Sequence, residues 1–347
     1  MSATEFMSPS FGNPPLVTVF GGSGFLGRFV VAALAERGYR IRVAVRRPDL
    51  AWYLKTLGEV GQIQPVQANL RNKESIAHAV KGASSVINLA AILQETKNQK
   101  FEAIHAEGPK LIAEALDDTA SLIHVSALGA DLNARSLYAQ TKARGEENIL
   151  KIRPDAVILR PSVIFGEGDA FFNRLAWLIR LGPVLPVPGL RALMQPVYGG
   201  DVAKAILNSV QGQAKEGTIY ELGGPHIQSF KDILEYIAGI TGRKCKFMNM
   251  PAGLARFHAF MMELTDKLTL GLVPDELVVT RDQLALLDQP NIVSHQAMAE
   301  NRTFAGLGIV PQSFEGIVPE YLERFCKTGQ FEKEKVRAEQ IQSHMTA

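Results

Sequence analysis

The sequence predicts an α/β fold built on a parallel sheet, and three observations support this prediction. Short apolar runs alternate with amphipathic helical patterns over residues 16–165. The runs lack the polar–apolar alternation of half-exposed strands, as expected where helices cover both faces of a sheet. A cluster of glycines separates the first run from the first helical pattern.

The elements follow in order along the chain. The first strand is expected at Leu16–Phe20, and the helix after the glycines has one apolar face and ends at Gly38. The next strands are expected at Tyr39–Val45, Ile63–Gln67, Ser85–Leu89, Ser121–Ser126 and Asp155–Arg160.

The glycine cluster is the strongest functional motif. It contains Gly21, Gly22, Ser23, Gly24, Phe25, Leu26 and Gly27. Glycines between a strand and a helix permit a tight turn, close approach of a pyrophosphate and close helix–strand packing. The helix N-terminus adds free N–H groups and the positive end of the dipole. The motif predicts a Rossmann-type, doubly wound sheet that binds a dinucleotide; the alternative is a purely structural turn.

After about residue 165 the regular alternation of strand and helix patterns ends. Gly182–Gly189 contains three prolines and is expected to be a loop. We predict a flexible N-terminus (1–15), a Rossmann core (16–165), a mixed region (166–327) and a flexible tail (328–347). The mixed region is expected to return to the Rossmann lobe over about 195–241 and otherwise to form a smaller, mainly helical substrate lobe.

Composition excludes several classes of protein. The 347 residues carry 37 Lys and Arg against 35 Asp and Glu, a net charge of +2. That balance argues against a disordered chain or a nucleic-acid binder. Two cysteines, and histidines without ligand spacing, argue against a disulfide framework or a metal site. The N-terminus resembles neither a secretory signal nor a presequence, and no apolar run is long enough to span a membrane, so we expect a cytoplasmic protein.

The end of the second strand bears on the choice of cofactor. NAD-specific sites commonly place an acidic residue there, on the ribose 2′-hydroxyl. Here Arg46 and Arg47 occupy the place, and guanidinium groups suit a 2′-phosphate. NADP(H) is therefore favoured over NAD(H). The alternative is that both arginines face water beside Asp49.

Two other strand ends offer weaker cofactor contacts. Asn69 follows the third strand, where an amide suits the adenine edge. Leu89, Ala90 and Ala91 follow the fourth strand, where small residues let a cofactor lie across the sheet edge.

Tyr138 and Lys142 lie one helical turn apart and are candidate catalytic residues. A lysine charge lowers the pKa of a nearby phenol, so the pair suits proton transfer. Ser126, at the end of the fifth strand, is placed to hydrogen-bond a substrate oxygen; the alternative is a turn serine.

Apolar residues also form a stripe in the second half. Phe257, Phe260, Met261, Leu264 and Leu268 recur at helical spacing within residues 255–270. We interpret the stripe as core-facing, with a membrane or partner face as the alternative.

These motifs together resemble the short-chain dehydrogenase/reductase superfamily in its extended or atypical branch, whose members are epimerase/dehydratase-like. The matching segments occur in order over residues 16–240: Gly21–Gly27, Asn88–Ala91, Tyr138 with Lys142, Arg160–Gly166, Pro196–Ala203 and Glu221–Pro225. Within the superfamily, the chain is most similar to the nucleotide-binding accessory subunits of respiratory complex I and their bacterial relatives. That likeness lies in Val19–Val30, Leu122–Ser126, Lys142–Glu146, Met194–Tyr198 and Thr280–Leu284.

The resemblance implies a tightly held NADP(H), with Pro161 and Val163 among its contacts. In the complex I subunit the nucleotide is regarded as mainly structural, and the subunit sits near the quinone where the two arms of the complex meet. The implied partners are respiratory complex I subunits or the membrane surface, with the protein peripheral on the inner face of the cytoplasmic membrane.

Three functions therefore compete. The first is a nucleotide-binding accessory protein of NADH:ubiquinone oxidoreductase. The second is an active NAD(P)-dependent oxidoreductase or epimerase acting on a nucleotide sugar or a quinone- or isoprenoid-like substrate. In it Tyr138 would transfer the proton and Lys142 would hold the nicotinamide ribose. The third, a redox-sensing regulator, has no dedicated motif.

Overall fold

The computed structural model describes residues 14–326, apart from residue 97 and residues 269–279. The predicted tail (328–347) and all but the last two residues of the predicted N-terminal segment lie outside this range. The chain divides into two compact units. Unit 1 comprises the chain up to Pro161 with Gly200–Leu222 and Ser294–Val310; unit 2 comprises Ser162–Gly199, Gly223–Val293 and the chain from Pro311.

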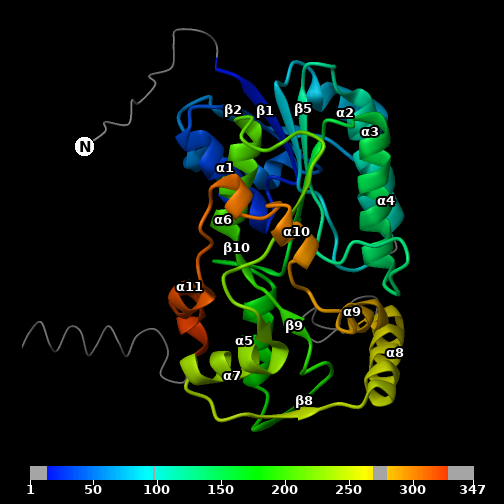
Figure 1. The fold of residues 1–347 in the computed structure, drawn as a ribbon, viewed down its shortest axis with the longest axis vertical. Helices are drawn as coiled ribbons and strands as arrows, with labels where there is room; N and C mark the ends of the chain where they lie inside the picture. Colours follow the sequence, from blue (N-terminus) through cyan, green and yellow to red (C-terminus); the bar gives the residue numbers. More distant parts are fainter. Residues whose placement is uncertain (1–13, 97, 269–279, 327–347) are drawn as a thin grey trace, which may run out of the picture. The chain divides into compact units, whose positions relative to one another are not determined.

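Unit 1 contains a seven-stranded sheet with the order β11-β6-β5-β4-β1-β2-β3 (Figure 1). Its neighbouring strands all pair in parallel. The strands are β1 (Leu16–Phe20), β2 (Arg40–Val45), β3 (Ile63–Gln67), β4 (Ser85–Asn88), β5 (Ser121–Val125), β6 (Val157–Pro161) and β11 (Ile219–Leu222). The direction of the strand order reverses between β1 and β4, as in a doubly wound sheet. The predicted α/β fold is confirmed.

Helices cover both faces of this sheet. Figure 1 shows α2, α3 and α4 together on one face, with α1 and α6 on the other. The helical elements are α1 (Phe25–Glu36), η1 (Pro48–Leu57), α2 (Lys73–Val80), η2 (Glu102–Glu107), α3 (Gly108–Ala115), α4 (Leu137–Ile152), α6 (Gly199–Val210), α10 (His295–Ala299) and η3 (Ala305–Leu307). Buried Val86 and Leu122 from the strands pack with Ile112 and Ile149 from α3 and α4. Apolar burial on both faces accounts for the uninterrupted apolar runs in the sequence.

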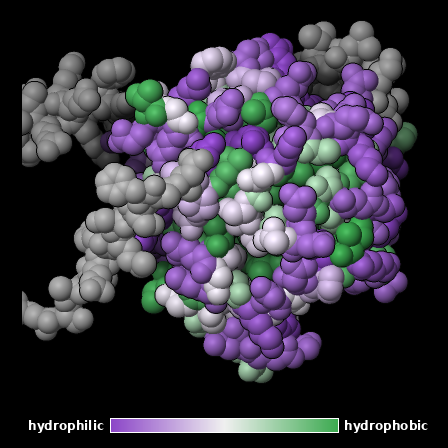
Figure 2. Space-filling model, turned by 90° about the horizontal axis from the view of Figure 1, so that it is seen from above, coloured by the Kyte–Doolittle hydropathy of each residue, from purple (hydrophilic) through white to green (hydrophobic). Residues whose placement is uncertain are grey.

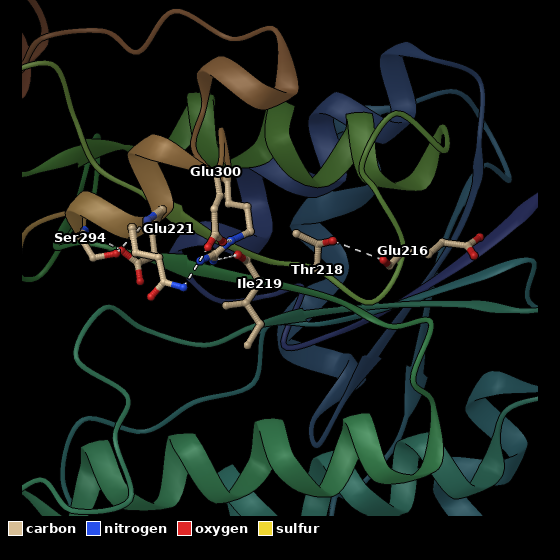
Figure 3. Close-up of polar contacts among 9 residues, drawn as sticks. Glu216, Thr218, Ile219, Glu221, Ser294 and Glu300 are labelled. Atoms are coloured by element: carbon tan, nitrogen blue, oxygen red, sulfur yellow. Dashed lines mark hydrogen bonds and ion pairs between the residues drawn. The ribbon is translucent and has the colours of Figure 1, made fainter.

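The edge strand β11 is covered by a segment distant in the sequence. Glu221 N–H donates to the Arg302 carbonyl (2.9 Å), and Arg302 Nη1 donates to the Ile219 carbonyl (2.7 Å). A Glu221 carboxylate oxygen accepts from Ser294 N–H at 2.7 Å (Figure 3). The segment Ser294–Val310 thus occupies backbone groups that an edge strand would otherwise expose.

Unit 2 has short strands and a helical core. The strands β7 (Ile164–Phe165), β8 (Val184–Val187), β9 (Leu193–Met194), β10 (Val197–Tyr198), β12 (Gln228–Ser229) and β13 (Lys246–Asn249) form three two-stranded sheets. The helical elements are α5 (Phe171–Ile179), α7 (Phe230–Ile240), α8 (Ala252–Leu268), α9 (Arg281–Leu286), α11 (Phe314–Leu322) and η4 (Glu323–Phe325). Phe172, Ile233 and Val318 meet in its core.

One segment predicted as a loop contains a strand. Within Gly182–Gly189, residues Val184–Val187 form β8 and pair in parallel with β13. The prolines are compatible with this strand because β8 is paired on one side only, so Pro186 needs no N–H donor on its other side.

The apolar stripe on α8 does not face a core. Phe257, Phe260 and Met261 are exposed, whereas Ala255 and Ala259 are buried against Leu284. The core-facing interpretation is therefore wrong for these three residues. The side chains of Leu264 and Leu268 lie outside the described part of the molecule.

Seen from the top of Figure 1, unit 1 presents a mainly hydrophilic surface with hydrophobic residues scattered over it (Figure 2). In the part of the chain that the structure describes, no helix combines the length and apolar character needed to cross a bilayer.

Candidate nucleotide site and catalytic residues

The glycine turn after β1 is shaped by close backbone contacts. Gly21 has a φ of +76°, and a Cβ there would lie 3.0 Å from the backbone nitrogen of Ala90. A Cβ on Gly27 would lie 2.4 Å from the backbone of Gly22. The turn thus brings α1 against β1 and leaves the helix N-terminus without a side-chain cap. An uncapped helix start behind a glycine cradle fits a bound pyrophosphate.

The two arginines after β2 differ in their surroundings. Arg47 binds Asp49 through two hydrogen bonds (2.7 and 3.3 Å), and the contact holds the pKa of that carboxyl below its usual range. Arg46 is exposed and has no polar partner among the described residues. Of the two, Arg46 is the guanidinium available to a ligand.

The helix η1, which follows these arginines, is tied to the glycine turn. The Tyr53 hydroxyl donates to the Ser23 carbonyl at 2.8 Å. This bond fixes the distance between the two segments that would flank an adenosine ribose.

The other predicted cofactor contacts lie at strand ends, as expected. Asn69 Oδ1 accepts from Arg71 N–H (3.1 Å), which leaves its amide NH2 group for a ligand. Leu89 and Ala90 are half-buried and Ala91 is exposed. Pro161 ends β6 in unit 1, whereas Val163 belongs to unit 2 and packs against the core of that unit.

Two of the three predicted catalytic residues, Lys142 and Ser126, lie at the end of β5. Lys142 Nζ donates to the carbonyl of Val125, the residue before Ser126, at 3.1 Å. The Ser126 hydroxyl is buried and has no hydrogen-bond partner among the described residues. Tyr138 lies in the first turn of α4, half-buried. The buried, unpaired hydroxyl suits an oxygen-containing ligand.

Burial controls the charge of Lys142. Its side chain is 1% exposed, and this burial lowers the pKa of the ammonium group to about 8. The carboxylate of Glu146, one turn further along α4, opposes the shift. Glu146 is itself buried and paired with Arg160 on β6. The buried ammonium group therefore loses its proton more easily than that of an exposed lysine.

Three buried polar residues lie beside this site; Asn88 was named only within a family-matching segment, and His105 and His124 were not singled out. Asn88 Nδ2 lies 3.1 Å from His124 Nδ1, and His105 contacts the first turn of α4. For His124 a signal was present, because it lies two residues before Ser126 on the same face of a strand. For His105 there was none, because the π-helical turn that carries it has no sequence signature.

The arrangement suits one kind of chemistry. A nicotinamide, when bound, accepts or supplies a hydride. Tyr138 and Lys142 would then hold or move a proton, and Ser126 would orient an oxygen atom of the substrate. Among the described residues no group of three His, Cys, Asp or Glu side chains is placed to bind a metal.

Comparison with known proteins defines the class. The chain belongs to the NAD dependent epimerase/dehydratase family, which it matches over residues 17–223. A nicotinamide dinucleotide is the cofactor of that family, and the glycine turn fits it.

Individual relatives are more specific. The chain is 32% identical over 321 residues to NADH dehydrogenase [ubiquinone] 1 alpha subcomplex subunit 9, mitochondrial, of Arabidopsis thaliana, covering 90% of this chain and 79% of that protein. It is 29% identical over 241 residues to a ceramide reductase of Caulobacter vibrioides (68% of this chain, 74% of that protein). The crystal structure of gox2253 shares the fold, with a TM-score of 0.64 and 22% identity over 88% of this chain and 96% of that one.

Proposed function

We propose that this protein is an NADP(H)-binding accessory subunit of a respiratory NADH:ubiquinone oxidoreductase. The observation that carries the proposal is the 32% identity to a subunit of that enzyme over 90% of the chain. The likeness extends well past the residues matched by the family. In this role the nucleotide stabilises unit 1, and the protein is cytoplasmic, peripheral on the inner face of the cytoplasmic membrane.

The preference for NADP(H) is supported by Arg46. Its guanidinium is exposed and unpaired among the described residues, and the carboxylate of Asp49 is engaged by Arg47. We expect Arg46→Ala to weaken NADPH binding about tenfold, as for loss of one charge-assisted contact. NADH binding should change by less than threefold, and Arg47→Ala is the matched control with the smaller effect. Equal losses for both nucleotides, measured by calorimetry, would refute the preference.

The apolar face of α8 is the surface we assign to docking on the respiratory complex. Leu254, Phe257 and Met261 are exposed, and with Met248 and Pro186 they line a hollow of about 410 Å³. An apolar surface of this kind, on a relative of a complex subunit, marks a protein interface.

Affinity purification in mild detergent tests this assignment. The tagged wild type should recover respiratory subunits, and Phe257→Ser with Met261→Ser should lose them. Leu50→Ser, an equally exposed position on η1, is the control and should retain them. Recovery of no respiratory subunit by the wild type would refute the proposed function. Binding of the wild type to protein-free vesicles, lost in the α8 variant, would reassign the face to the membrane.

The second candidate is an active reductase or epimerase. It is supported by the Tyr138, Lys142 and Ser126 cluster and by the similarity to a ceramide reductase. Substrates of this class would be nucleotide sugars or quinone- and isoprenoid-like molecules. NADPH oxidation with such substrates should fall at least a hundredfold in Tyr138→Phe. Equal turnover by the two proteins would eliminate this candidate.

A further inference from the structure

We propose that His105 is a positioning residue that joins the loop beside the glycine turn to the helical turn that carries Tyr138. The loop is Leu89–Ile92, and the helical turn is the start of α4. The proposal rests on nucleotide binding by unit 1 and adds a residue on which that site depends.

Both ring nitrogens of His105 are engaged. Ile92 N–H donates to Nε2 at 3.1 Å, and Nδ1 lies 3.2 Å from the hydroxyl oxygen of Thr141. Because a backbone N–H only donates, Nε2 must be unprotonated, and the neutral ring carries its proton on Nδ1. The ring therefore donates to Thr141, whose hydroxyl donates in turn to the carbonyl of Leu137 (2.9 Å) or Tyr138 (3.0 Å). One side chain thus bridges the loop and the first turn of α4.

The ring of His105 also packs against Tyr138. Their centroids lie 5.1 Å apart with an interplanar angle of 84°, an edge-to-face contact. Phe101 stacks on His105 (5.2 Å) and meets Tyr138 edge-on (5.8 Å). Three rings in mutual contact restrict the orientation of the phenol.

The backbone of His105 is fixed as well. It lies in the π-helical turn η2, which contacts α4. A Cβ on Gly145 would lie 1.9 Å from the His105 carbonyl oxygen, so only glycine permits the contact. π-Helical turns recur at functional sites, where they redirect a side chain.

The charges around His105 keep it neutral. Burial and the nearby Lys142 ammonium lower its pKa to about 3. His124, which also faces Lys142, is held neutral by burial, and its pKa lies well below the usual value. A neutral ring with both nitrogens occupied does not act as an acid or base. It holds its neighbours in place.

A second set of hydrogen bonds holds the same loop. Ala90 N–H donates to Asn88 Oδ1 at 3.1 Å, and Asn88 Nδ2 donates to His124 Nδ1 at 3.1 Å. Ala90 is the residue that a Cβ on Gly21 would meet. The position of the loop therefore sets the space available at the glycine turn.

Two substitutions separate the two contacts of His105. In His105→Gln the longer side chain can still accept from Ile92 N–H, and in His105→Asn the shorter one can still donate to Thr141. We expect His105→Asn to weaken NADPH binding about tenfold, because the loop loses its support. His105→Gln should stay within threefold of the wild type. His78→Asn, the same substitution at an exposed histidine on α2, is the matched control and should bind like the wild type.

Binding and melting temperature measured on the same variants decide the outcome. Equal weakening by both His105 variants, in proportion to their loss of melting temperature, would overturn the proposal, as would unchanged binding in both. Failure of the wild type to bind NADPH or NADH would instead refute the proposed function.

A spectroscopic test needs no variant. Two-bond nitrogen–proton NMR of the wild type should show His105 as the Nδ1–H tautomer from pH 5 to pH 8. An Nε2–H tautomer, or titration near pH 6.5, would overturn the proposal.

Discussion

Two helices of this protein break the usual rule that charged side chains are exposed and large apolar ones are buried, and they break it in opposite ways. In unit 1, α4 buries charge: Lys142 is 1% exposed and Glu146 is 3% exposed. In unit 2, α8 exposes hydrophobic surface: Leu254 is 62% exposed and Phe257 is 63% exposed, while Ala255 and Ala259 are buried.

The two departures are compensated differently. The buried charges of α4 have partners within unit 1, because Glu146 pairs with Arg160 and Lys142 donates to the Val125 carbonyl. The exposed side chains of α8 are not covered by the described residues, and burial against further apolar surface would stabilise them. Buried charges that are paired within the protein suit a cofactor site. Apolar side chains left exposed suit an interface.

The largest expected effect tests the close packing of unit 1. Gly27→Ala places a Cβ 2.4 Å from the Gly22 backbone, which forces α1 away from β1. We expect a loss of about 3 kcal/mol in unfolding free energy and at least a tenfold loss of NADPH affinity. Chemical denaturation and calorimetry measure the two effects.

The matched control for Gly27→Ala lies in unit 2. Gly239 is exposed on α7, and a Cβ there meets nothing within 4 Å. Gly239→Ala should stabilise the protein by about 0.5–1 kcal/mol, because alanine is the better helix former. Similar effects of the two substitutions would show that the glycine turn is not closely packed.

The second prediction concerns the buried charge of α4. The pKa of Lys142 is about 8 in the folded protein and about 10.5 when unfolded. Between these values the unfolded chain binds more protons than the folded one, so stability rises with pH. Relative to Lys142→Met, the wild type should gain about 2 kcal/mol of unfolding free energy between pH 7.5 and pH 10. Urea denaturation at pH 7.5 and pH 10 measures the gain, and parallel curves for the two proteins would contradict the burial of a charged amine.

Much of unit 1 was predictable because its motifs encode backbone geometry. Gly21 and Gly27 are required by contacts that any side chain would break, so the glycine spacing predicts both the turn and the helix start. The strands were predictable because burial on both faces demands uninterrupted apolar runs.

Unit 2 and the histidine contacts were not predictable for physical reasons. An apolar stripe has the same period whether it faces a core or a partner. The spacing of Phe257 and Phe260 therefore could not show which of the two surfaces they face. β8 has prolines that mark a loop in most settings, and its pairing with β13 depends on residues about sixty positions away. His105 was missed because its contacts, to Ile92 and Thr141, join residues far apart in the sequence.

The smallest expected effect tests whether α8 truly has its large residues outside. Ala259 is fully buried, and a leucine there would have to displace Leu284 or Met250. Ala259→Leu should cost about 1–3 kcal/mol of unfolding free energy through overpacking. Phe257→Ser, which removes a much larger apolar side chain, should change the unfolding free energy by no more than about 0.5 kcal/mol, because the ring is exposed. Chemical denaturation of both variants in the absence of a partner makes the comparison. The reverse order of costs would mean that Phe257 packs inside the protein, and the docking surface assigned to α8 would then be lost.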